Sequence, residues 1–311
     1  MNATLTTLTI DELVRAEVAE NAVFVDAMRN CNPQKRFATP LDILLWKRFR
    51  RSRERDIAGV IPHYESQIAH WVSREQPIAF VLIAFPFKTR TKTNRRTPDA
   101  GEFWFISQLA RLSHLMRTVY EPGAHFTILT ESEVFAPLFE VAEAEWQAYL
   151  DGIRVLAEAL NAPLDFLSLK QLVDGTPNFW TIFERRLRET KADETHHLYR
   201  VFLGAQNDVA STEKAVKMMR WYLAFGETRY ETGVPADVFP NHLYVSVTAK
   251  PGRLAIWHIQ EGCDYLPHQG VPVRIGSKKR ILPLGQANGA EPVYVEDERF
   301  VENGQPFLYR S

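Results

Sequence analysis

Hydrophobic and polar positions predict that the chain begins with helices and then enters a buried strand. Apolar residues recur at helical spacing over residues 9–29 and 40–60, and the second stretch ends in mixed charges that suit an exposed helix face. A continuous apolar run, IAFVLIAF (78–85), follows Pro77 and has the length of a strand that is covered on both faces. The first 77 residues are therefore interpreted as an N-terminal helical segment that serves as a lid or as packing.

The pattern then alternates between helix and strand. The predicted elements are, in order, an amphipathic helix over 102–121, a strand over 125–130, one long helix over 131–161, a strand over 163–169, and helices over 178–207 and 211–231. Strands that alternate with helices indicate a parallel sheet. The sequence thus predicts an α/β fold.

From His242 onward the pattern changes to short strands. LYVSVTAKPGRLAIWHIQ (243–260) has two alternating runs around a Lys-Pro-Gly turn, and VPVRIG, KRILPLG, PVYVE and QPFLYR follow. This β-rich part either extends the first sheet or forms a small subdomain. No linker-like stretch precedes it, which favours one domain.

Composition narrows the class of protein. The 311 residues carry 37 basic and 38 acidic side chains, with a pI near 6.8, which argues against a general binder of nucleic acid or of anionic membranes. No apolar run approaches the roughly 20 residues of a membrane helix. The two cysteines, Cys31 and Cys263, form neither a disulfide framework nor a zinc motif. We therefore expect a protein of the reducing cytoplasm.

One stretch concentrates positive charge in this neutral chain. FPFKTRTKTNRRTPDAGE (85–102) holds five cations, which are Lys88, Arg90, Lys92, Arg95 and Arg96. A run of charges is often a solvated loop. This loop, however, lies between a buried strand and a helix start, where open α/β sheets bind ligands and where helix N–H groups bind phosphate. Both interpretations stay open.

Two carboxylates close the same stretch. Asp99 stands at a helix N-cap position with Glu102 three residues later, the spacing of a capping box. Beside cations, the same carboxylates suit pairing with an ammonium group or stabilising an imine. The structural and the chemical role are compatible.

Several familiar motifs are missing from the sequence. There is no GxGxxG, no GxxxxGK[ST], no HExxH and no GxSxG. Dinucleotide, P-loop, zinc-protease and α/β-hydrolase chemistry therefore have no support from sequence.

Eight segments of the sequence resemble those of a known family. They are FPFK, PDAGE, the Y-x-PGA that ends the following helix, TILTESEVF, YRVFL (199–203), FPNHLYVSVTAK, LPHQGVPV and GQPFLYR. In order and spacing, residues 78–311 resemble the pyoverdine/dityrosine biosynthesis family, which includes the isonitrile (isocyanide) synthases. The resemblance implies a Rossmann-like mixed sheet flanked by helices, with residues 78–311 as the catalytic domain. It also implies a transferase or lyase of secondary metabolism that joins an amino-acid amine to the ketone carbon of ribulose 5-phosphate. The chemistry that the resemblance implies requires no metal or redox cofactor, and an iron and 2-oxoglutarate oxygenase is the partner enzyme expected to act next.

The site residues follow from the resemblance position by position. The implied catalytic residues are Lys88, Asp99, Glu102 and His268, and the implied substrate-binding residues are Arg90, Lys92, Arg96, Glu131, Arg200, Ser246 and Lys250. The sequence departs from the family pattern at Tyr244, Thr248 and Gln269, which replace an arginine and two histidines. His268 is expected to supply the missing imidazole, and Lys250 the missing charge.

The departures keep two alternatives open. One is a related enzyme that modifies an amine differently, by N-formylation or by another condensation with a sugar phosphate. The other is a non-catalytic protein that binds an anion or nucleic acid through the basic loop. The balanced charge and the lack of aromatic residues among the cations of that loop count against it.

Overall fold

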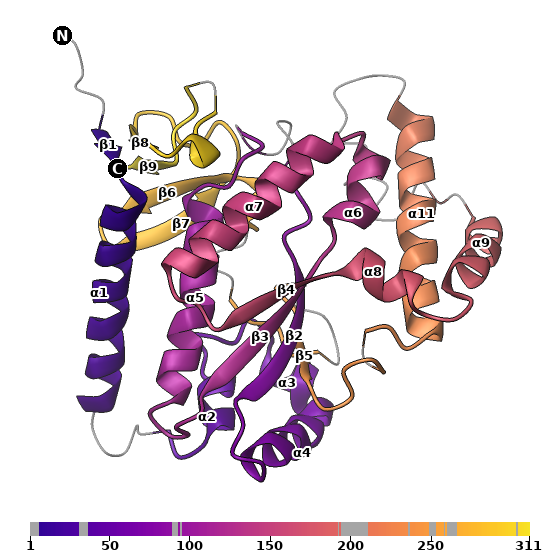
Figure 1. Ribbon diagram of the computed structural model, residues 1–311, viewed down its shortest axis with the longest axis horizontal. Helices are drawn as coiled ribbons and strands as arrows, with labels where there is room; N and C mark the ends of the chain where they lie inside the picture. The colour runs from indigo at the N-terminus through magenta and orange to yellow at the C-terminus, as the bar shows by residue number, and fades with distance from the viewer. Residues whose placement is uncertain are drawn as a thin grey trace.

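Two β-sheets and the helices around them make up the computed structural model (Figure 1). The structure describes residues 6–30, 37–88, 93, 95–191, 193, 211–235, 237–248, 253–257, 259, 266–302 and 304–311. The predicted α/β fold with a strand-rich C-terminal part is confirmed.

The first sheet is parallel throughout. Its strands are, in spatial order, β4 (Leu164–Ser168), β3 (Ala124–Thr130), β2 (Ile78–Ala84) and β5 (Leu243–Val245). The chain leaves β2 towards β3 and β4 and later returns to the other side of β2 with β5. The strand order therefore reverses between β2 and β5, and the carboxyl ends of such strands border a crevice.

Helices cover both faces of this sheet, which explains the unbroken apolar run of β2. On one side lie α4 (Ile61–Val72), α5 (Ala100–Met116) and α7 (Glu143–Ala159); on the other lie α6 (Ser132–Phe135), α8 (Leu169–Asp174), α9 (Phe179–Glu189) and α11 (Ser211–Glu231). Phe80 and Leu82 pack in the core with α5 and α7, whereas Val81 packs in the core with α8, α9 and α11. Successive side chains of β2 therefore pack into two different cores, one on each face of the sheet.

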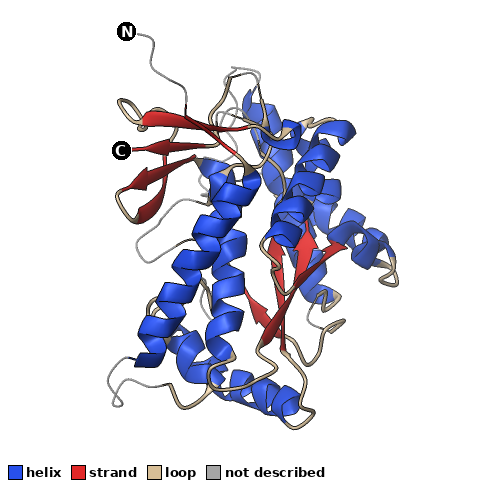
Figure 2. Ribbon diagram, turned by 60° about the vertical axis from the view of Figure 1, so that its left-hand side comes forward, coloured by secondary structure: helices blue, strands red, loops and turns tan. Residues whose placement is uncertain are grey.

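The second sheet is mixed and joins the two ends of the chain. Its spatial order is β1 (Thr6–Leu8), β8 (Glu291–Val295), β9 (Leu308–Arg310), β6 (Val271–Ile275) and β7 (Lys278–Leu282). Figure 2 shows this sheet above the long helices α1 (Ile10–Asn30) and α5, near both termini. Both C-terminal alternatives hold in part, because β5 extends the parallel sheet and the later strands form a sheet of their own.

Some predicted helices are broken in the structure. The helix predicted over 131–161 is divided into α6, the 3₁₀ helix η3 (Ala136–Phe139) and α7. Pro137 has no N–H to donate, and Glu140 adopts a left-handed φ of 57° that ends the turn. The prediction of one continuous helix there was wrong.

The helix predicted over 40–60 is also wrong as a single element. The structure has α2 (Pro40–Leu45), α3 (Glu54–Ile57) and the 3₁₀ helix η2 (Ala58–Val60). Between α2 and α3, Arg51 N donates to Ala255 O at 2.7 Å, so the chain is held against residues 253–257. Of the helix predicted over 178–207, the structure describes α9, and residues 194–207 lie outside the described residues. Among the described helices, none combines the length and the hydropathy needed to cross a bilayer.

Candidate active site

The capping box predicted at the start of α5 is present. Asp99 Oδ1 accepts a hydrogen bond from Gly101 N at 2.8 Å, and Glu102 Oε2 accepts one from Asp99 N at 2.9 Å. A methyl group on Gly101 would lie 3.0 Å from Ile281 Cδ1 and 3.3 Å from Pro267 Cβ. Glycine at this position therefore lets the C-terminal part of the chain pack closely on the first turn of α5.

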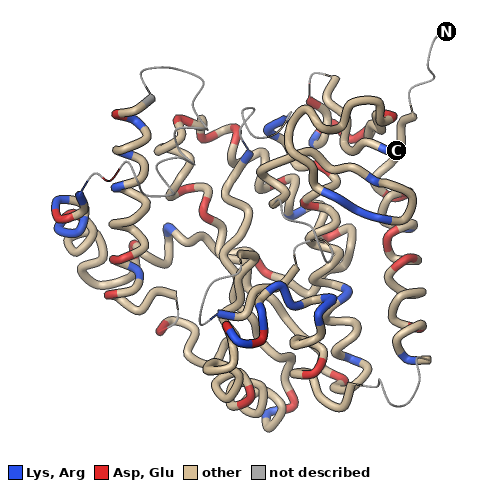
Figure 3. The backbone as a smooth tube through the Cα atoms, turned by 180° about the vertical axis from the view of Figure 1, so that it is seen from behind, with Lys and Arg blue, Asp and Glu red and all other residues tan. Residues whose placement is uncertain are grey.

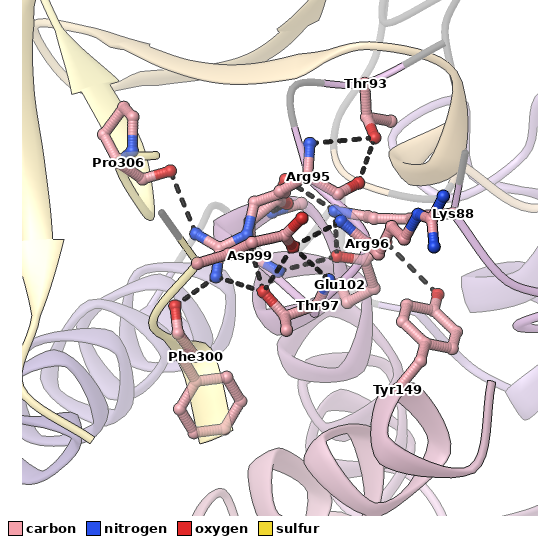
Figure 4. Close-up of polar contacts among 12 residues, drawn as sticks. Lys88, Thr93, Arg95, Arg96, Thr97, Asp99, Glu102, Tyr149, Phe300 and Pro306 are labelled. Atoms are coloured by element: carbon pink, nitrogen blue, oxygen red, sulfur yellow. Dashed lines mark hydrogen bonds and ion pairs between the residues drawn. The ribbon is translucent and has the colours of Figure 1, made fainter. Parts of the chain in front are cut away.

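Lys88 reaches both capping carboxylates. Its Nζ lies 2.5 Å from Asp99 Oδ2 and 2.8 Å from Glu102 Oε2, and all three side chains are buried (Figure 4). A buried charge of this kind is stable only when it is paired. The first cation of the basic stretch is thus part of an ion cluster with the residues that start α5, rather than part of a solvated loop. We call Lys88, Asp99 and Glu102 the α5 cluster.

The α5 cluster favours a bound proton on Glu102. Complete burial raises the pKa of Glu102 to about 7; Lys88 acts against this rise, and the neighbouring Asp99 adds to it. Tyr149 of α7 donates its hydroxyl to Glu102 Oε1 at 3.3 Å, and burial raises the pKa of Tyr149 well above its ordinary value. Glu102 is therefore a carboxyl group that exchanges a proton near neutral pH.

A cavity of about 1080 Å³ lies at the carboxyl ends of β2, β3 and β5. Glu102 and Tyr149 line it, so the α5 cluster opens onto this space. Three predicted site residues from distant parts of the chain line it as well: Glu131, Ser246 and His268. The cavity lies at the crevice that the strand order predicts.

These three residues come from separate elements. Glu131 follows β3 and precedes α6, and Ser246 follows β5, where its hydroxyl donates to Thr248 O at 2.7 Å. His268 belongs to the 3₁₀ helix η4 (Pro267–Gln269), whose Pro267 lies close to Gly101. The fold therefore brings an imidazole and a second carboxylate to the same cavity as Glu102.

The remaining cations of the basic stretch lie differently. Arg95 is 1% exposed and donates from Nη1 to Pro306 O at 3.0 Å and from Nη2 to Phe300 O. Arg96 forms an ion pair with Glu145 of α7, and neither arginine lines the cavity. Four predicted residues lie outside the described residues: Arg90, Lys92, Arg200 and Lys250.

Several cavity residues were not among the predicted site residues. They are Tyr149, Tyr222, Arg229, Tyr244 and Arg253. Burial raises the pKa of Tyr222 to about 12, and Glu131 contributes to this rise. Helical spacing marks Tyr149 and Arg229 as ordinary helix residues, and no local signal in the sequence assigns them to a site.

The fold is that of an open α/β protein, and a cavity lined by acidic and basic residues lies at the carboxyl ends of its parallel strands, the place where such sheets bind ligands. A sequence profile of the pyoverdine/dityrosine biosynthesis proteins matches residues 68–226. The chain belongs to this family, as its sequence motifs predicted.

Curated relatives carry isonitrile synthase names. The chain is 34% identical over 98 residues to an L-tyrosine isonitrile synthase of Pseudomonas aeruginosa, covering 31% of this chain and 30% of the relative. It is 30% identical over 117 residues to an L-tryptophan isonitrile synthase of Fischerella ambigua, covering 37% and 36%. An isocyanide synthase A of Aspergillus fumigatus is 28% identical over 104 residues, covering 32% and 17%. The chain thus matches about a third or less of the length of these relatives.

A solved structure shares the fold over most of the chain. The crystal structure of the PvcA protein from Pseudomonas aeruginosa superimposes with a TM-score of 0.64 and 24% sequence identity. The superposition covers 87% of this chain and 99% of that chain. The architecture described above is therefore the architecture of a known protein of this kind.

Proposed function

We propose that the protein is an isonitrile synthase-like enzyme that condenses the amine of an amino acid with the ketone of ribulose 5-phosphate through an imine. Its family membership and the names of its relatives support this function. The observation that carries the proposal is the α5 cluster, a buried lysine held by two carboxylates, one of which opens onto the main cavity.

The cluster suits the first chemical step of such a condensation. An amino acid arrives as an ammonium ion, and only the free amine attacks a ketone. Glu102, whose burial raises its pKa to about 7, is poised to accept that proton at neutral pH. Once Glu102 has passed this proton on, the cluster of one lysine and two carboxylates again carries one net negative charge, which would stabilise a positively charged imine.

Lys88 acts in this proposal through its neighbours. Because its ammonium group is buried against Asp99 and Glu102, it sets the proton affinity of Glu102 and holds the carboxylate in place. His268 supplies a second acid–base group from another wall of the cavity. Glu131 and Ser246 contribute polar contacts at the ends of β3 and β5.

The test is turnover by the purified protein. It is given ribulose 5-phosphate labelled with ¹³C at the ketone carbon and a panel of amino acids, with an isonitrile-selective trap and mass detection. We expect a trapped product that carries the label and that is absent with the Glu102→Gln variant. A panel in which no amino acid gives a trapped product would contradict the isonitrile reaction.

A second candidate is an amine-modifying reaction with a different product, such as N-formylation. The residues that favour it are Tyr244, Thr248 and Gln269, which line the cavity where the family pattern has an arginine and two histidines. Without these groups the later eliminations have fewer proton carriers. Product masses from the same assay distinguish a formamide from an isonitrile, because the two differ by one water.

A further inference from the structure

The β5 side of the cavity contains a pair of arginines that do not belong to the basic stretch. Arg229 comes from α11, and Arg253 comes from the segment that runs beside β5. Both side chains line the cavity, together with Tyr244 of β5. The cavity therefore has a cationic wall as well as the carboxylates Glu102 and Glu131.

Tyr244 lies in contact with both arginines. Arg229 Nη2 donates to the Tyr244 hydroxyl at 3.0 Å, and Arg253 Cζ lies 4.0 Å from the centroid of the Tyr244 ring. The Tyr64 hydroxyl donates to Tyr244 O at 2.9 Å and accepts from Leu254 N at 3.2 Å. Tyr64 thus fixes the backbone on which Tyr244 and Arg253 stand.

Neither guanidinium is neutralised by the described part of the protein. Arg229 contacts the Tyr244 hydroxyl and the Val234 carbonyl, and Arg253 stacks on the Tyr244 ring. Among the described residues, no carboxylate lies within ion-pair distance of either side chain. Glu102, Glu131 and Asp237 also line the cavity, but neither half-buried guanidinium forms an ion pair with a described residue. Such groups suit an anionic ligand, since arginine presents paired N–H donors to oxyanions.

The basic stretch offers less to an anion than its sequence predicts. Its three cations with described side chains already have partners: Lys88 binds Asp99 and Glu102, Arg95 binds backbone carbonyls, and Arg96 binds Glu145. The cations of the described cavity that form no ion pair with a described residue are instead Arg229 and Arg253. By resemblance, Tyr244 replaces an arginine, and the fold surrounds that position with two arginines from other elements.

We propose that Arg229 and Arg253, with the Tyr244 hydroxyl between them, bind the phosphoryl group of the sugar-phosphate co-substrate. This assignment rests on the proposed function for the identity of the sugar phosphate. Two guanidinium groups match the double negative charge of a phosphate monoester, whereas a carboxylate carries one charge. The carboxylates Glu102 and Glu131, which also line the cavity, are available to the ammonium group of the second substrate.

Binding without turnover tests the subsite. Titration calorimetry of the full chain uses ribulose 5-phosphate, unphosphorylated ribulose and inorganic phosphate as probes. For Arg229→Gln and Arg253→Gln we expect affinity for ribulose 5-phosphate to fall by about 10- to 100-fold, the loss typical of a charge-assisted contact. Arg154→Gln is the matched control, because Arg154 lies on the surface of α7 and pairs with Asp151.

Conservative variants guard against loss of folding. Arg229→Lys and Arg253→Lys retain the charge but lose the forked donors, and we expect them to bind ribulose 5-phosphate between the wild type and the Gln variants. Circular dichroism confirms that each variant is folded. Unchanged affinity in both Gln variants, or a wild type that binds neither ribulose 5-phosphate nor inorganic phosphate, would overturn the assignment. With L-tyrosine as a fourth probe, a loss of tyrosine binding but not of ribulose 5-phosphate binding in the Gln variants would also overturn the assignment, in favour of a carboxylate site.

The subsite and the proposed function fail separately. If the wild type binds ribulose 5-phosphate through the two arginines but no amine is converted to an isonitrile, the subsite stands and the reaction is wrong. If isonitrile forms and the KM for ribulose 5-phosphate of both Gln variants equals that of the wild type, the reaction stands and the subsite is wrong.

Discussion

Two charge clusters in this molecule each bring a buried lysine to two carboxylates but differ in the number of cations. In the α5 cluster, one lysine contacts two carboxylates. In a second cluster, Lys279 of β7 lies 2.7 Å from Glu17 and 3.0 Å from Glu20, both on α1. Arg111 of α5 adds contacts of 3.7 and 3.6 Å to the same two carboxylates. We call this set the α1 cluster, and it has more cations than the α5 cluster has.

The surroundings differ as much as the balance. The α1 cluster joins α1, α5 and β7, and none of its members lines the main cavity. Figure 3 shows the basic positions of β7 beside acidic positions of α1. Burial by itself would raise the pKa of Glu20, but Lys279, Arg111 and Arg274 outweigh it, and the pKa is lowered. The pKa of Glu102 is raised.

The comparison indicates what each cluster does. In the α1 cluster two cations face two carboxylates, the pKa of Glu20 is lowered, and the contacts link three elements. In the α5 cluster two carboxylates contact one cation, and burial raises the pKa of Glu102 to about 7. Lysine and carboxylate side chains therefore link three elements in the α1 cluster and provide a carboxyl group with a pKa near neutral in the α5 cluster.

The largest effect is expected from Lys88→Met. Removing the only lysine of the α5 cluster leaves two buried carboxylates uncompensated, which costs about 3–5 kcal/mol of unfolding free energy. Activity should fall by about a hundredfold or more, as for other lost charge contacts at a reacting centre. The stability loss should be smaller at pH 5 than at pH 8, because a protonated Glu102 carries no charge. Urea unfolding at both pH values measures it, with exposed Lys278→Met as control; equal losses would contradict the role of Glu102.

Glu102→Gln should remove acid–base chemistry with less harm to folding. Since burial raises the pKa of Glu102 to about 7, the proton-accepting form of the wild type is lost as the pH falls through 7, and its rate should fall accordingly. The variant should be slower by about a hundredfold and should lack this acidic limb. Rate–pH profiles from pH 5.5 to 9 check this. An unchanged limb in the variant would assign it to another group, such as His268.

Glu17→Ala should break the α1 cluster without altering the chemistry. It leaves Lys279 buried with Glu20 as its remaining carboxylate, so we expect a loss of about 3 kcal/mol, at the lower end for a broken buried pair. The specific activity of the folded fraction should remain that of the wild type. Thermal unfolding and active-site-normalised rates measure both, with exposed Glu65→Ala as the control. A large loss of kcat would show that the two clusters are coupled.

Tyr149→Phe should have the smallest effect. The variant loses the hydroxyl that donates to Glu102 Oε1, a bond that contributes about 0.5–1.5 kcal/mol. A donor to the charged carboxylate favours that form, so its loss should move the acidic limb to higher pH. Tyr294→Phe, in β8 and outside the cavity lining, is the control. A limb that does not move would leave Tyr149 with a packing role alone.

Local signals in the sequence predicted the framework of the site. The unbroken apolar run of β2 and the capping box of Asp99 and Glu102 depend on neighbouring residues, and both are present. The break at Pro137 was missed although the sequence carries its signal, because a proline seven residues into the helix predicted over 131–161 removes a backbone donor and interrupts the helix. Element type was predictable wherever the pattern was long and regular.

The polar contacts of the site were less predictable. The five cations suggested a single anion site, yet Lys88 and Arg95 are buried against partners that include residues 300–306, far along the chain. Arg229 and Arg253 are separated in sequence and meet at Tyr244 through the docking of α11 and the fixing of β5 by Tyr64. Such pairs arise from tertiary packing, which periodicity does not encode.

The start of α5 depends on residues near the far end of the chain. Ala100 N donates to Phe307 O at 3.0 Å, Arg95 binds the carbonyls of Phe300 and Pro306, and Glu302 Oε2 accepts from Thr97 N at 2.9 Å. During synthesis, the helix that carries Asp99 and Glu102 is made some 200 residues before these partners. The ribosome must therefore release residues 300–307 before the site can close. A nascent or prematurely terminated chain would hold its carboxylates without the segment that fixes them.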